Sequence, residues 1–73
     1  MNENEKQQNE VTDLLLIEHG LRLLQEKLNG ELKAVENSRE TETAKTFLNE
    51  SYTANLNRTT KLLKETTNKI LNI

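Results

Sequence analysis

Few side chains in this sequence have the types and the spacing that chemistry requires. His19 is the only histidine and there is no cysteine, so a zinc site with thiolate and imidazole ligands is not expected. No pair of carboxylates stands in an apolar segment, as acid–base catalysis would require. The sequence also lacks a glycine-rich phosphate loop and a nucleophile with a base nearby. We therefore expect no enzymatic activity, no cofactor and no metal.

The clearest charge pattern is a basic segment, residues 57–73. Its four cations accompany a single acid, Glu65; they are Arg58, Lys61, Lys64 and Lys69. A basic amphipathic helix can lie on an anionic membrane, but this polar face is dominated by Thr and Asn, so membrane contact is only the weaker alternative. The net charge of −2, one Phe, one Tyr and no Trp argue against nucleic-acid binding. We interpret the segment as solvated charge on a packed helix.

Length and composition indicate one small, elongated unit. The chain has 73 residues, of which 33% are hydrophobic and 30% charged, and chains of this size bury little surface. The first ten residues, MNENEKQQNE, have no apolar run typical of a signal peptide, and no apolar stretch approaches the roughly 20 residues that span a bilayer. We therefore expect an intracellular location, cytoplasmic or nuclear.

The elements that carry these residues are predicted to be helices. The chain has no Pro and only two Gly, and Thr12 or Asp13 can cap a helix after a disordered polar tail over residues 1–11. Apolar residues then follow a heptad frame that starts with Leu14 at position a. Its a sites are Leu14, Leu21, Leu28, Val35, Glu42, Asn49, Leu56, Leu63 and Ile70. Its d sites are Ile17, Leu24, Glu31, Ser38, Lys45, Tyr52, Thr59, Thr66 and Ile73. The frame indicates a helical coiled-coil or bundle segment over residues 12–73.

The middle of this frame is polar, which leaves two arrangements open. Five of the six seam positions between residues 31 and 49 are polar, and a dry seam does not tolerate so many. The chain can form one continuous coiled-coil helix of about 60 residues, about 90 Å long. Alternatively, it reverses near residues 37–43 and two helices pack antiparallel.

Local signals favour the hairpin. Asn37 followed by Glu40 has the spacing of a capping box, and the segment ENSRETET contains no apolar residue. Residues 1–40 hold nine acidic and five basic side chains, a net of −4, whereas residues 41–73 hold three and five, a net of +2. Opposite net charges attract antiparallel halves modestly. A helix break at Asn29–Gly30 is a second possibility.

The apolar arc of the first helix is too wide for one partner. Eight of the fifteen residues in LLLIEHGLRLLQEKL, residues 14–28, are apolar, whereas a two-stranded seam needs only positions a and d. Leu16 and Leu23 recur outside that seam. A second helix can cover one face of the first, so further partners are expected. The predicted protein-interface residues are Leu14, Leu16, Ile17, Leu21, Leu23, Leu24, Leu28, Leu32, Val35, Phe47, Leu48, Tyr52, Leu56, Leu63 and Ile70.

These features predict an all-α fold, an antiparallel two-helix hairpin that contributes to an oligomeric helical bundle or coiled coil. In size and pattern, residues 12–73 are similar to the very small coiled-coil subunits of hetero-oligomeric helical assemblies, without a diagnostic motif. The expected function is a structural or interaction subunit of a multi-protein helical complex, with other helical proteins or further copies of itself as partners. The alternatives are a homodimeric regulator or inhibitor that binds a target protein, and a membrane-associated adaptor that uses the basic segment.

Overall fold

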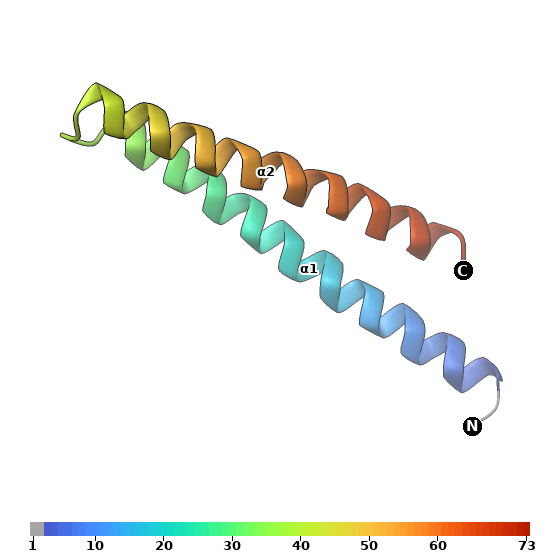
Figure 1. Ribbon diagram of the computed structural model, residues 1–73. Coiled ribbons are helices and arrows are strands. Elements are labelled where there is room, and N and C mark those ends of the chain that lie inside the picture. The colour runs from blue at the N-terminus through green and yellow to red at the C-terminus, as the bar shows by residue number, and fades with distance from the viewer. Residues whose placement is uncertain (1–2) are drawn as a thin grey trace.

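The computed structural model describes residues 3–73 and confirms the helical hairpin. Helix α1 spans Glu3–Glu36 and helix α2 spans Glu42–Leu71, and the two run antiparallel, so that the start of α1 and the end of α2 lie on the same side of the molecule (Figure 1). The molecule is a rod of 58 × 15 × 14 Å. The single continuous helix is therefore excluded as the fold of this chain.

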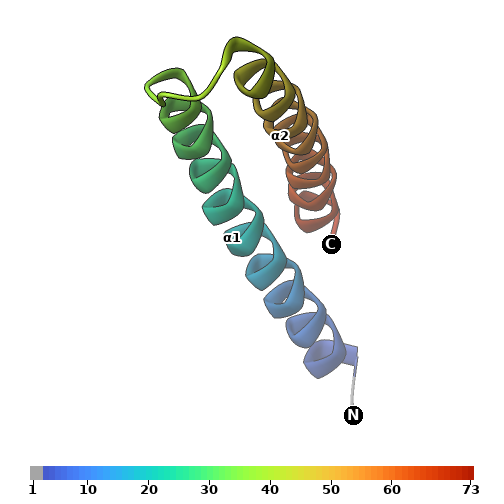
Figure 2. The ribbon, with the colours of Figure 1, turned by 60° about the vertical axis from the view of Figure 1, so that its left-hand side comes forward.

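Helix α1 begins earlier than the sequence indicated. It is already helical at Glu3, where we expected a disordered tail over residues 1–11; residues 1–2 of that tail lie outside the described residues. The expected cap at Thr12 or Asp13 is not used, because the Thr12 hydroxyl lies within the helix and donates to the carbonyl of Gln8 at 2.9 Å. Glu, Lys and Gln are good helix formers, which explains the early start. This first part of α1 runs on past the end of α2 (Figure 2).

The connection between the helices occupies residues 37–41, within the predicted reversal. The Thr41 hydroxyl caps α2 and accepts a hydrogen bond from the backbone N–H of Ala44 at 3.2 Å. The predicted cap, Asn37, has another role, because its side-chain amide donates to the carbonyl of Lys33 and helps to close α1. The possible helix break at Asn29–Gly30 does not occur, since α1 continues through both residues.

Two side-chain hydrogen bonds define the register of the hairpin. The Gln25 amide donates to the Thr60 hydroxyl at 3.1 Å, and the Thr67 hydroxyl donates to Glu18 at 3.3 Å. The two bonds are separated by seven residues on each helix, in opposite directions. This spacing is that of a continuous antiparallel heptad pairing.

The core is a thin line of small and medium side chains between the two helices. Its most buried members are Leu28 and Val35 at 7% exposure, Leu63 at 8%, Thr59 at 4% and Thr66 at 8%. Both threonine hydroxyls bond to carbonyls of their own helix, Thr59 to Asn55 at 2.7 Å and Thr66 to Leu62 at 2.8 Å. Because the hydroxyls are satisfied within α2, threonine can occupy the core without leaving a polar group unpaired.

Candidate protein-interaction surface

Ten of the predicted interface residues lie along the contact between α1 and α2. Each is buried or half-buried, and we call the two rows they form the seam. They are Leu14, Leu21, Leu28, Leu32 and Val35 on α1 and Leu48, Tyr52, Leu56, Leu63 and Ile70 on α2. These residues hold the hairpin together, so within one chain they are not free to bind a partner.

The predicted seam is wrong at two positions of α1. Ile17 and Leu24, at position d of the heptad frame, are 51% and 41% exposed. Their places beside α2 are taken by Glu18 and Gln25, which are half-buried and make the hydrogen bonds to α2. The physical reason is the width of the apolar arc. One neighbouring helix can cover only part of it, and the part that α2 covers includes Glu18 and Gln25 rather than Ile17 and Leu24.

The uncovered side chains of α1 form a continuous surface, which we call the outer face. It consists of Leu16, Ile17, Gly20, Leu23 and Leu24, whose spacing of three and four residues places them side by side on a helix. Leu16 is 66% exposed and Leu23 53% exposed. An added Cβ at Gly20 would meet no atom within 4 Å in the described chain. The outer face is thus apolar, open and flat at its centre.

The remaining predicted interface residue, Phe47, does not join this surface. It lies near the start of α2 and is 69% exposed, where it lines a shallow hollow of about 390 Å³ with Glu42, Thr43, Thr46 and Glu50. All five residues belong to α2. Phe47 is therefore largely exposed on α2 and does not extend the outer face, which lies on α1.

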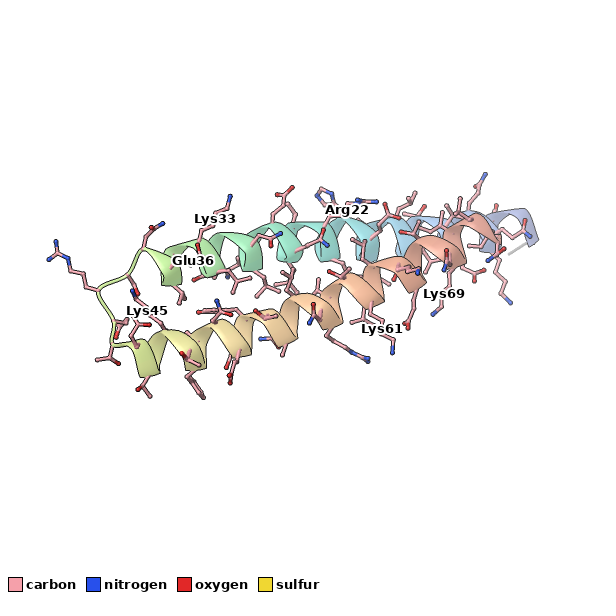
Figure 3. The ribbon with its side chains drawn as sticks, turned by 90° about the horizontal axis from the view of Figure 1, so that it is seen from above. Arg22, Lys33, Glu36, Lys45, Lys61 and Lys69 are labelled. Atoms are coloured by element: carbon pink, nitrogen blue, oxygen red, sulfur yellow. The ribbon has the colours of Figure 1, made fainter. Side chains whose placement is uncertain are left out.

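Chemically reactive groups are scattered rather than gathered. His19 is exposed, and the described residues contain no group of three His, Asp or Glu side chains placed to hold a metal ion. Glu18 forms an ion pair with Arg22 at 3.2 Å on the surface of α1. Figure 3 shows Arg22 and Lys33 pointing away from α2, and Lys61 pointing away from α1. Within the described chain, neither helix is long and apolar enough to cross a membrane.

Sequence reasoning missed the polar part of the seam. Thr59 and Thr66 occupy position d of the predicted frame and are almost completely buried, but they are not among the predicted interface residues, and the links from Glu18 and Gln25 to α2 were not predicted. A signal was present in the regular spacing of threonines in the second half of the chain.

Comparison with protein-family models, with curated proteins and with solved structures gave no match.

Proposed function

We propose that this chain is a non-enzymatic interaction subunit that contributes its helices to a larger helical assembly. The observation that carries the proposal is the outer face, where four large aliphatic side chains on two turns of one helix are 41–66% exposed. Single exposed leucines are ordinary on protein surfaces, but contiguous apolar patches mark interaction sites. The occupant that fits such a face is the apolar side of another helix.

The thin core supports the same proposal. Among the described residues only three hydrophobic side chains are buried, and none of the side chains is fully enclosed. A two-helix unit of this kind gains little from burial, about 25 cal/mol per Å², relative to the conformational entropy lost on folding. A partner on the outer face adds apolar burial that the hairpin alone lacks. The proposal includes an intracellular location, cytoplasmic or nuclear, with which the absence of cysteine is compatible, since the fold needs no oxidising environment.

Affinity purification from the native host tests this function. The wild-type chain is compared with a Leu16→Glu and Leu23→Glu double variant, which charges only the outer face. The matched control carries Leu15→Glu and Asn29→Glu, which add the same charge at exposed positions elsewhere on α1. We expect the wild type and the control to retain helical partners, including untagged copies of the chain, and the double variant to lose them. Equal recovery from all three would contradict the proposed function.

A further inference from the structure

The outer face has an internal symmetry about Gly20. Residues at equal distances before and after this glycine have matching properties: Leu16 corresponds to Leu24, and Ile17 corresponds to Leu23. All four side chains are exposed. A second α1 helix turned through a two-fold axis at Gly20 would therefore place aliphatic side chains opposite aliphatic side chains on both sides of the axis.

The charges at the ends of the outer face follow the same symmetry with opposite signs. Asp13 lies seven residues before Gly20 and Lys27 lies seven residues after it, on the same side of the helix and both exposed. In the described part of the hairpin neither side chain takes part in an ion pair. An antiparallel copy would bring Asp13 to Lys27 twice, whereas a parallel copy would bring like charges together.

Gly20 makes no packing contact with the other helix in the described hairpin. Glycine weakens a helix interior relative to alanine, and no atom of the described chain approaches the place where its side chain would be. At the centre of an antiparallel pair of helices, the missing side chain lets the two backbones approach closely. The same position therefore lies on the symmetry axis and leaves the room that a helix–helix contact uses.

We propose that the occupant of the outer face is α1 of a second copy of this chain, antiparallel and related by a two-fold axis at Gly20. The inference rests on the proposed function, since it names the partner of the same surface. Such a contact is closed: the same patch is used on both copies and none remains to bind a third. Each α1 then has two neighbours, α2 of its own chain on the seam and α1 of the other copy on the outer face.

Sedimentation equilibrium of the purified full chain tests the stoichiometry. This measurement reports mass without regard to the elongated shape, and we expect twice the chain mass of 8.4 kDa at about 100 µM. The Leu16→Glu and Leu23→Glu variant should remain monomeric, and the Leu15→Glu and Asn29→Glu control should dimerise. A wild-type monomer whose host partners still depend on Leu16 and Leu23 would overturn the dimer while leaving the proposed function intact. If neither dimerisation nor the recovery of host partners depends on Leu16 and Leu23, both the dimer and the proposed function are wrong.

Disulfide trapping tests the register. The chain contains no cysteine, so Asp13→Cys and Lys27→Cys each introduce a single thiol. Mixed together they should form a cross-linked dimer under mild oxidation, whereas neither alone should, because in the antiparallel pair identical positions are about 21 Å apart along the axis, from 14 residues at 1.5 Å. Cross-linking of Asp13→Cys with itself would show a parallel contact and overturn the proposal, as would failure of the mixture to cross-link.

Charge exchange gives an energetic check of the same pairing. Asp13→Lys alone should weaken the dimer about tenfold, because two attractive pairs become two repulsive ones. Adding Lys27→Asp in the same chain should restore the affinity of the wild type. Without that restoration, Asp13 does not lie opposite Lys27 and the two-fold axis at Gly20 is wrong.

Discussion

The sharpest test of the seam is the loss of stability expected when Leu28 is replaced by alanine. Replacement of a buried leucine by alanine costs about 2–5 kcal/mol, and the cost increases with the cavity that remains. Leu28 is 7% exposed, and among the described residues no side chain is fully enclosed. The walls around Leu28 can therefore relax and water can enter, which places the expected loss for Leu28→Ala in the lower part of the range, at about 2–3 kcal/mol.

That loss is large for a chain of this size. At roughly 0.05–0.15 kcal/mol per residue, 73 residues give a total unfolding free energy of about 4–11 kcal/mol. Urea denaturation followed by circular dichroism should show a clear fall in the midpoint with an unchanged slope. All variants must be compared at one chain concentration, because association adds to the apparent stability.

The matched control is Leu15→Ala, which removes the same atoms from a residue of the same helix that is 49% exposed. Alanine also has the higher helix propensity, so the expected change stays within about 0.5 kcal/mol. A difference of at least about 1.5 kcal/mol between the two variants is therefore expected. Equal losses at Leu28 and Leu15 would refute the position of the seam.

Four further results are expected. Leu24→Ala should lower the midpoint little in dilute solution and more at high concentration, because its side chain becomes covered only when the outer face is occupied; a concentration-independent loss would contradict this. Thr41→Ala should cost about 1 kcal/mol in urea denaturation, since its hydroxyl caps α2; a neutral result would mean that another residue caps the helix. Thr59→Val should be neutral or slightly stabilising in the same assay, because its backbone-bonded hydroxyl is replaced by a methyl group of similar shape; a loss above about 1 kcal/mol would show that the hydroxyl has another partner. Spin labels at His19 and Asn68, diluted with unlabelled chains, should lie within roughly 20 Å, as expected for adjacent packed helices. A distance near 70 Å would indicate a continuous helix.

The hairpin could be predicted from the sequence because its determinants are local. A polar segment interrupts two apolar patterns, and no proline lies on either side of it. The residues at which the helices end and begin were harder to predict from the sequence. Asn37 and Thr41 are both good capping residues and lie four positions apart, and only the three-dimensional structure shows that Asn37 closes α1 while Thr41 opens α2.

The heptad frame predicted the seam of α2 better than that of α1. On α2, the a and d positions from Tyr52 to Ile70 are all buried or half-buried. On α1 the a positions face α2 but Ile17 and Leu24 do not. A frame read from one helix reflects all of its neighbours together, and α1 has a wider apolar arc than one neighbour covers. The partner that covers the remainder cannot be seen in the frame alone.

The threonines in the seam link folding to docking. A leucine at Thr59 or Thr66 would bury more apolar area, and the hairpin would then depend less on anything outside it. Threonine places only one methyl group in the seam, and its hydroxyl donates a hydrogen bond to a carbonyl of its own helix. The seam therefore specifies a register but adds little stability. If the outer face is occupied as we propose, binding adds about 2.7 kcal/mol when the partner is at 100 times its dissociation constant. That gain is comparable to the predicted effect of losing Leu28, so an abundant partner should offset the destabilisation caused by Leu28→Ala.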